Sequence, residues 1–290
     1  MYDESFFGTL KRGYFSIPIA IRTVMTISGI FFILTFFPLI GMGQWIVNWF
    51  GFYSEPLTAF TQPWRFITYI FVHGGLFHIL FNMLILWWIG RVVEEDLGPR
   101  NFSVLFYGAG IGGVLIDLII RTSFGLTPMP IVGASGGVMG ILVCFAVMYP
   151  RRKIFLWLLI PIEARFLVAG LIFVDFLFLG GQDNVAREVH LGGAATGFLL
   201  MKMYQNGYHY DLWIESIMST FRKKRKAKSA TAGTAGKTRK GTMHAVSDAE
   251  VVSEEKQNEL DRILEKISKE GYEGLTDEEK KILFELSKRN

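Results

Sequence analysis

The sequence contains little cysteine and comparatively little charge. Cys144 is the single cysteine among 290 residues, which excludes an intramolecular disulfide framework and any zinc or iron–sulfur site built from several cysteines. Charged residues make up 19% of the chain, against about a quarter in a typical soluble domain. The zinc-protease pattern His-Glu-x-x-His is also missing, because His73 and His78 lack that spacing. This composition argues against a disordered chain, a collagen and a coiled-coil rod.

Apolar residues are abundant instead, at 51% of the chain with a mean hydropathy of +0.33. A helix needs roughly 20 apolar residues to cross the bilayer core. Six stretches approach this length, which predicts an all-α polytopic membrane protein with six transmembrane helices. They are Val24–Ile40, Leu76–Gly90, Phe102–Ile120, Gly133–Tyr149, Ala164–Leu179 and Val189–Tyr204. The first is not expected to be a secretory signal peptide, because no small-residue cleavage site follows it.

The basic residues predict the orientation of these spans, since cytoplasmic loops carry an excess of Lys and Arg. With the N-terminus in the cytoplasm, ten basic residues flank the spans on the inner side and three lie on the outer side. The inner residues are Lys11, Arg12, Arg22, Arg91, Arg100, Arg151, Arg152, Lys153, Arg165 and Lys202, and the outer ones are Arg65, Arg121 and Arg187. Both termini are therefore predicted to be cytoplasmic.

The domain organisation follows from changes in composition along the chain. We expect a cytoplasmic N-terminus at residues 1–22, a six-helix domain at 23–210, a basic segment with a flexible linker at 211–252 and a helical hairpin at 253–290. The basic residues at 222–228 are typical of a membrane-flanking anchor, and the apolar composition argues against their being a nucleic-acid patch.

Two segments outside the spans carry their own signals. The outer loop Gly41–Gly75 is rich in Trp and Phe, which predicts a structured and partly membrane-embedded element. In the tail, Thr276 and Glu279 have the spacing of a capping box that opens the second helix of the hairpin. Apolar residues recur at helical spacing in both tail helices, so this hairpin is expected to dock on another surface.

Four polar residues lie at one predicted depth of the membrane. Spans two, four and six all run from outside to inside, and His78, Asn82, Ser135 and His190 stand near their outer ends. Polar groups inside a span are costly and therefore candidates for function. Each also has a structural explanation: Ser135 as a small packing residue, and the other three as hydrogen-bonding groups between helices.

Glycines favour close contact between spans four and six. Gly133 and Gly137, and likewise Gly136 and Gly140, form GxxxG pairs in span four, and Gly193 and Gly197 form a small-residue face in span six. Packing of these faces against each other would bring Ser135 within reach of His190, as a nucleophile and its general base. His78 and Asn82 share one helical face and offer two donors, as an oxyanion hole requires.

At these residues the sequence resembles the rhomboid family of intramembrane serine proteases, over roughly Ile21 to Asn206. Five features occur in the family's order. They are Trp64-Arg65 in the first loop, His78-Ile79-Leu80-Phe81-Asn82 in span two, Glu94 after it, Gly133-Ala134-Ser135-Gly136 at span four, and His190 with Gly193 and Gly197 in span six. The resemblance implies a bacterial inner-membrane enzyme that cleaves the transmembrane segments of other proteins, with no cofactor and no metal. The tail hairpin is similar to a helical extension of some bacterial rhomboids.

The resemblance also implies a role for each site residue. Ser135 would be the nucleophile and His190 the general base and then the general acid, a dyad without a third, acidic member. The Ser135 backbone N–H, His78 and Asn82 would stabilise the oxyanion. Some members stack an aromatic residue, four positions after the serine, on the histidine, whereas this chain has Met139 there. The link Gly180–Asn184 is expected to be a mobile cap over the site.

Other classes fit the sequence less well. An aspartyl intramembrane protease would need two facing aspartates, but Asp117 and Asp175 lack its motifs, and Arg121 stands where it can pair with Asp117. We interpret these aspartates as members of structural pairs. A transporter would more often show an internal repeat, and none is convincing here. The remaining alternative is a catalytically inactive rhomboid-like protein that binds membrane proteins, but loss of Ser135 or His190 would mark such a protein and both are present.

Overall fold

The computed structural model describes residues 5–36, 42–156, 160–180, 185–216, 219, 262–263, 266, 274–276 and 279–280. Internal contacts divide the chain into two units, Met1–Arg222 and Lys223–Asn290, and each is described by itself. Of the predicted basic segment and flexible linker at 211–252, residues 211–216 and 219 are described, and they are helical. The rest of that segment and most of the predicted tail hairpin lie outside the described residues.

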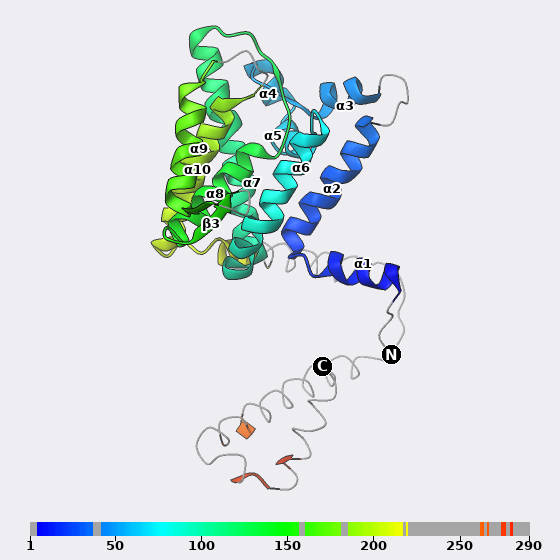
Figure 1. The fold of residues 1–290 in the computed structure, drawn as a ribbon, viewed down its shortest axis with the longest axis vertical. Coiled ribbons are helices and arrows are strands. Elements are labelled where there is room, and N and C mark those ends of the chain that lie inside the picture. Colours follow the sequence, from blue (N-terminus) through cyan, green and yellow to red (C-terminus); the bar gives the residue numbers. More distant parts are fainter. Residues whose placement is uncertain are drawn as a thin grey trace, which may run out of the picture. The chain divides into compact units, whose positions relative to one another are not determined.

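The first unit is predominantly helical (Figure 1). Its longer helices are α1 (Phe6–Phe15), α2 (Ile19–Phe36), α3 (Met42–Phe50), α6 (Leu76–Ile85), α7 (Arg91–Phe124), α8 (Ser135–Met148), α9 (Ala164–Leu177) and α10 (Arg187–Gln205). Its shorter elements are β1 (Phe52–Tyr53), α4 (Pro56–Thr61), α5 (Arg65–Thr68), the 3₁₀ turn η1 (Tyr69–Phe71), the π-helical turn η2 (Leu86–Gly90), β2 (Pro130–Ile131), β3 (Lys153–Leu156) and β4 (Ile160–Glu163). Figure 1 shows α3 and α4 at the end of the helical bundle opposite to α1.

A helix lies at each of the six predicted apolar stretches, but their continuity differs from the prediction. Helix α6, the π-helical turn η2 and α7 follow one another without a loop from Leu76 to Phe124. The run is interrupted at Gly98, whose φ of 78° and ψ of 160° are not helical, and the next residue is Pro99, which has no N–H to donate. By length and composition, Ile19–Phe36 and Leu76–Phe124 qualify as membrane spans among the described residues.

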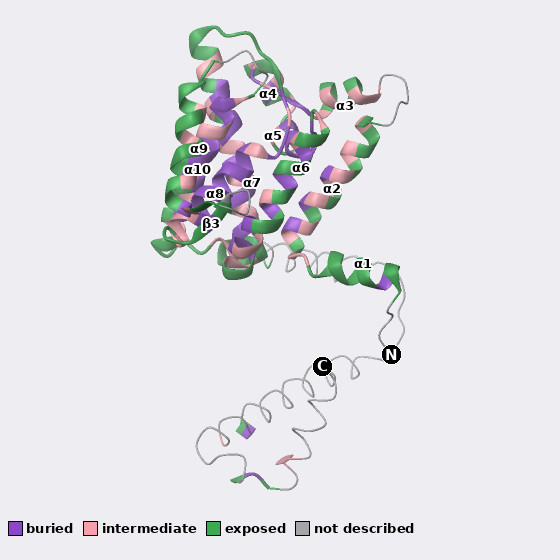
Figure 2. Ribbon diagram, in the orientation of Figure 1, coloured by how far each residue is buried: buried purple, intermediate pink, exposed green. Residues whose placement is uncertain are grey.

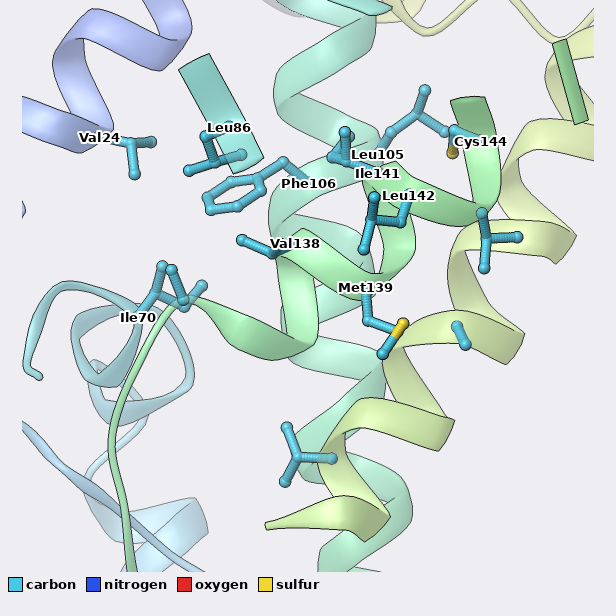
Figure 3. Close-up of a cluster of buried hydrophobic side chains, with 14 of the residues drawn as sticks. Val24, Ile70, Leu86, Leu105, Phe106, Val138, Met139, Ile141, Leu142 and Cys144 are labelled. Carbon is cyan, nitrogen blue, oxygen red and sulfur yellow. The ribbon is translucent and has the colours of Figure 1, made fainter. Parts of the chain in front are cut away.

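The core lies between α7, α8 and α10, where Figure 2 concentrates the buried residues. Every residue of α8 from Gly136 to Phe145 is buried. Figure 3 shows Leu86, Phe106 and Val138, which come from η2, α7 and α8, gathered in one apolar cluster. Burial on all sides explains why the sequence of α8 has no polar stripe.

The outer surfaces of several helices are also apolar. Exposed large side chains include Ile33 of α2, Phe77 and Phe81 of α6, and Phe173 and Phe176 of α9. A soluble monomer rarely exposes so much contiguous apolar surface. A hydrocarbon solvent accommodates it, because the backbone polar groups of helices are satisfied internally.

The aromatic outer loop is structured, as the sequence predicted, and Arg65 holds it together. This side chain is buried at the start of α5. Its guanidinium donates to the carbonyl oxygens of Gly51 and Asn48, both at 2.5 Å, and to the Gln62 side chain at 2.7 Å. The C-terminal end of α3 and the residue after α4 therefore converge on one cation, whose N–H groups donate to three acceptors.

Two small β ladders were not predicted, so the fold is not purely α-helical. Strands β1 and β2 pair Phe52 with Ile131, and β3 and β4 form an antiparallel hairpin between α8 and α9. The hairpin begins at Lys153, which is one of the basic residues expected on the inner side of the membrane. Its segments are too short to show a strand periodicity in the sequence.

Glu94 links α7 to α2 through a helix cap. Its carboxylate is buried and accepts hydrogen bonds from the backbone N–H groups of Ala20 and Ile21, at 2.8 and 2.9 Å. These are first-turn donors of α2, which have no partner within their own helix. An anionic acceptor at a helix N-terminus also interacts favourably with the helix dipole.

In the second unit, the capping box at Thr276 is confirmed. The Thr276 backbone N–H donates to the Glu279 carboxylate at 2.8 Å, and the Glu279 N–H donates to the Thr276 hydroxyl oxygen at 3.3 Å. Lys266 also contacts this carboxylate, at 2.9 Å. These partners, Lys266 foremost, lower the pKa of Glu279 to about 2.

Removal of the Glu94 carboxylate should destabilise the first unit. We expect Glu94→Ala to lower the free energy of unfolding by about 2 kcal/mol, since two buried N–H groups lose a charged acceptor. The control is Glu95→Ala, because Glu95 is exposed and pairs with Arg91 only across one helical turn. That pair should contribute less than about 0.5 kcal/mol to the free energy of unfolding. Unfolding titrations in detergent measure both, and equal effects would contradict the assigned role of Glu94.

Candidate active site

Ser135 is the first residue of α8, and a strained glycine turn places it there. Gly133 has a φ of 118°, which L side chains rarely adopt, and its N–H donates to the Tyr69 carbonyl oxygen at 2.9 Å. A Cβ on Gly133 would lie 2.5 Å from Cε1 of His78. The His78 ring therefore packs directly against the turn that presents Ser135, and both side chains are half-buried.

Helices α8 and α10 contact each other through their backbones, as the glycine pattern predicted. A Cβ on Gly193 would lie 2.2 Å from the carbonyl oxygen of Gly136, and one on Gly197 would lie 2.5 Å from Cα of Gly140. No side chain larger than hydrogen fits at these crossings. The contact adjoins both candidate catalytic residues, because Gly136 follows Ser135 and Gly193 lies one turn after His190.

Val189 lies against the helix that begins at Ser135. A Cβ on Gly136 would lie 2.9 Å from Cγ1 of Val189, the residue before His190. The chain neighbours of Ser135 and His190 are thus in van der Waals contact. No hydrogen bond joins the Ser135 hydroxyl to the His190 ring in the described part of the structure. Catalytic hydrogen bonds of this type are often long in the absence of substrate.

His190 has an acidic partner that the resemblance did not imply. Its Nδ1 lies 3.0 Å from Oδ2 of Asp175 on α9. The other oxygen of Asp175, Oδ1, lies 3.9 Å from Nε of Arg187. The resemblance implies a dyad without a third, acidic member, whereas the structure places the Asp175 carboxylate against the His190 ring. The sequence indicated Asp175 only as a member of a structural pair, because α9 and α10 come together only in the folded chain.

His78 and Asn82 lie one turn apart on α6. The side-chain amide of Asn82 is buried and donates to the His78 carbonyl oxygen at 2.8 Å. The structure places His78 beside the Gly133 turn that precedes Ser135, while one Asn82 donor is used within its own helix.

A third histidine lies behind this group. His73 is buried, and its ring centroid is 5.1 Å from that of His78. Its Nε2 accepts the backbone N–H of Ala134 at 3.4 Å, and its Nδ1 lies 3.2 Å from the Phe71 carbonyl oxygen. His73 therefore supports the turn before Ser135. The sequence showed it only as a histidine outside any recognised spacing.

The second intramembrane aspartate belongs to a structural pair, as predicted. Asp117 is fully buried in α7 and accepts a hydrogen bond from Arg121 at 2.9 Å and another from the Ser54 hydroxyl. Arg121 also lies 4.0 Å from Glu188 of α10. These contacts join α7 to the outer loop and to the start of α10.

Met139 occupies the position one turn after Ser135 and is buried in the core cluster (Figure 3). A flexible thioether fills an irregular gap but fixes a neighbouring ring less firmly than an aromatic side chain does. The predicted cap at Gly180–Asn184 lies outside the described residues from position 181 onward.

A helical bundle with an apolar exterior and polar groups held between glycine-packed helices has the architecture of a polytopic membrane protein. A model of the rhomboid domain matches residues 61–206, half of the chain. The chain belongs to the rhomboid family. A model described as a family of unknown function (DUF6576) matches residues 252–289, in the second unit.

Curated relatives include named proteases. The chain is 34% identical over 150 residues to the rhomboid protease GluP of Bacillus subtilis, covering 51% of this chain and 27% of that protein. It is 34% identical to RHOMBOID-like protein 4 of Arabidopsis thaliana, covering 53% and 36%, and 27% identical to Rhomboid-like protease 1 of Toxoplasma gondii, covering 66% and 65%. The chain thus spans between about a quarter and two thirds of the length of these relatives.

The glycine contact predicts a position-specific effect of one added methyl group. Gly193→Ala should destabilise the fold by 1–3 kcal/mol or more, roughly, because the Gly136 backbone that it meets cannot rotate away. Gly170→Ala on α9 is the control, since nothing lies within 4 Å of a Cβ there, and alanine favours a helix. In detergent, the thermal unfolding midpoint should be lower than that of the wild type only for Gly193→Ala. An unchanged midpoint would refute the backbone contact.

Proposed function

We propose that this protein is an intramembrane serine endopeptidase that cleaves transmembrane segments of other membrane proteins. The observation that carries the proposal is the glycine-mediated contact of α8 with α10, which sets the chain neighbours of Ser135 and His190 against each other. Membership of the rhomboid family and the protease names among the relatives support it.

In the proposed mechanism Ser135 is the nucleophile and His190 is the base. His190 Nε2 accepts the Ser135 hydroxyl proton as Oγ attacks the substrate carbonyl carbon, and it returns the proton to the departing amine. The backbone N–H of Ser135 at the α8 N-terminus donates to the oxyanion, together with His78 and with an Asn82 amide that turns from its helix. A water molecule then hydrolyses the acyl-enzyme by the same steps in reverse.

The membrane placement is part of the proposal. Six spans with both termini in the cytoplasm of a bacterial cell would set Ser135 and His190 near the outer face of the inner membrane. Water reaches a site at this depth more easily than one at the bilayer centre. A substrate helix hides its carbonyl groups in its own hydrogen bonds, so it must unwind before Ser135 can attack. Helix-weakening residues near the cleaved bond should therefore favour reaction.

Substitution of the site residues tests the chemistry directly. Ser135→Ala and His190→Ala should abolish cleavage of a transmembrane substrate in proteoliposomes. Asn82→Ala should lower the rate by about 10²-fold, the loss typical of one oxyanion donor. Each variant must be shown to be folded by its thermal unfolding midpoint.

Two results would refute this mechanism. One is full cleavage by purified Ser135→Ala protein, which would assign the activity to another group or another protein. The other is loss of wild-type activity on addition of a chelator, which would indicate a metal. A folded wild-type protein that binds membrane proteins without cleaving any of them would favour the inactive rhomboid-like alternative.

The tail is proposed to be separate from catalysis. Removal of Lys228 to Asn290 should leave the rate on a generic transmembrane substrate within about twofold of the full chain, because the proposed site lies at the opposite membrane face. Arg222–Arg225 are retained, since each basic residue near an anionic surface contributes about 1 kcal/mol to anchoring. Reconstituted cleavage at equal folded concentrations measures the effect. An inactive but folded short variant would make the tail part of the catalytic machinery.

A further inference from the structure

Asp175 is a charged side chain on a helix that is otherwise almost entirely apolar. Within residues 169–177, the two residues that are not exposed are Ile172 and Asp175. They lie on the same face of α9 as the buried Val168. Asp175 therefore faces the bundle rather than the surroundings. A carboxylate in such a place is costly unless it has partners.

Its partners divide its two oxygens between them. Oδ2 lies 3.0 Å from His190 Nδ1, and Oδ1 lies 3.9 Å from Arg187 Nε. Arg187 attracts one oxygen and so keeps the other directed at the imidazole ring. Asp175 and Arg187 are thus arranged around His190 rather than forming an isolated ion pair.

The hydrogen-bonding chemistry of histidine shows which atom donates in this contact. A carboxylate oxygen accepts hydrogen bonds, so the contact requires a proton on Nδ1 of His190. The neutral ring then has its lone pair on Nε2, the nitrogen that must take the proton from Ser135. The carboxylate also stabilises the imidazolium that forms after this transfer.

The other charged groups around His190 do not supply this interaction. On α6, the side chain beside the turn that precedes Ser135 is His78, and it offers no anionic oxygen. On α10 itself, Glu188 pairs with Arg121 of α7, which also holds Asp117. Helix α8 contributes no charged side chain.

We propose that Asp175 is a positioning residue for His190, which fixes the Nδ1–H tautomer and the ring orientation that the reaction with Ser135 needs. The inference rests on the proposed serine-protease function. It also supplies a restraint on the ring in a chain whose residue one turn after Ser135 is Met139.

The test uses the full chain in proteoliposomes and a fluorophosphonate, which reacts with an activated serine. Rates of Ser135 labelling at one fixed pH are measured for wild type, Asp175→Asn and Asp175→Glu. Asp175→Asn should lower the rate by about 10²-fold or more in protein that is shown to be folded. Asp175→Glu should recover much of this rate.

Asp117→Asn is the matched control, since it removes the other intramembrane carboxylate that pairs with an arginine. A purely structural role of aspartates would make the two Asn variants alike, each with a lower unfolding midpoint and a labelling rate reduced by the same factor. That result would overturn the proposal, as would an Asp175→Asn variant with the wild-type rate.

A second measurement needs no variant at position 175. In ¹⁵N-histidine NMR spectra of the folded wild-type protein, assigned with His190→Gln, the neutral His190 ring should carry its proton on Nδ1. A proton on Nε2 would overturn the proposal. Failure of the serine-protease function itself is recognised separately, because wild-type protein would then not label, or Ser135→Ala protein would label equally.

Discussion

The backbone contact between α8 and α10 is the constraint on which the proposed site depends. Gly136 and Gly140 of one helix meet Gly193 and Gly197 of the other with no room for a side chain. Lipid offers no hydrophobic driving force between helices, so close van der Waals packing of this kind must hold them together. The same contact fixes the distance between the residues that precede Gly136 and Gly193, among them Ser135 and His190.

The buried side chains of Glu94, Arg65 and Asp117 follow one rule, which is that each charge has specific partners. Glu94 caps α2, Arg65 binds two carbonyl oxygens of the outer loop, and Asp117 binds Arg121 and Ser54. An unpaired charge in this environment would be strongly destabilising. Asp175 obeys the same rule but has His190 as a partner, so its contact links stability to the proposed chemistry.

Much of the fold could be predicted because membrane helices leave strong signals in a sequence. Apolar length located helices at all six predicted stretches, and aromatic content indicated that the outer loop is structured. The short ladders of β1 with β2 and β3 with β4 could not be predicted, since two to four residues give no periodicity. The break at Gly98 and Pro99 was not predicted, although both residue types disfavour a continuous helix, and the π-helical turn η2 depends on packing against neighbouring helices.

The sequence by itself determined which residues are candidates for chemistry, because glycine spacing and polar groups within apolar helices are local properties of the chain. It placed Ser135, His190, His78 and Asn82 at one depth and identified the small faces that let their helices approach. Only the tertiary structure decided which groups touch. The contact of Asp175 with His190 spans the link between two helices, and its 3.0 Å geometry follows from how α9 lies against α10. No spacing along the chain encodes that approach, since it results from packing of both helices on the same core.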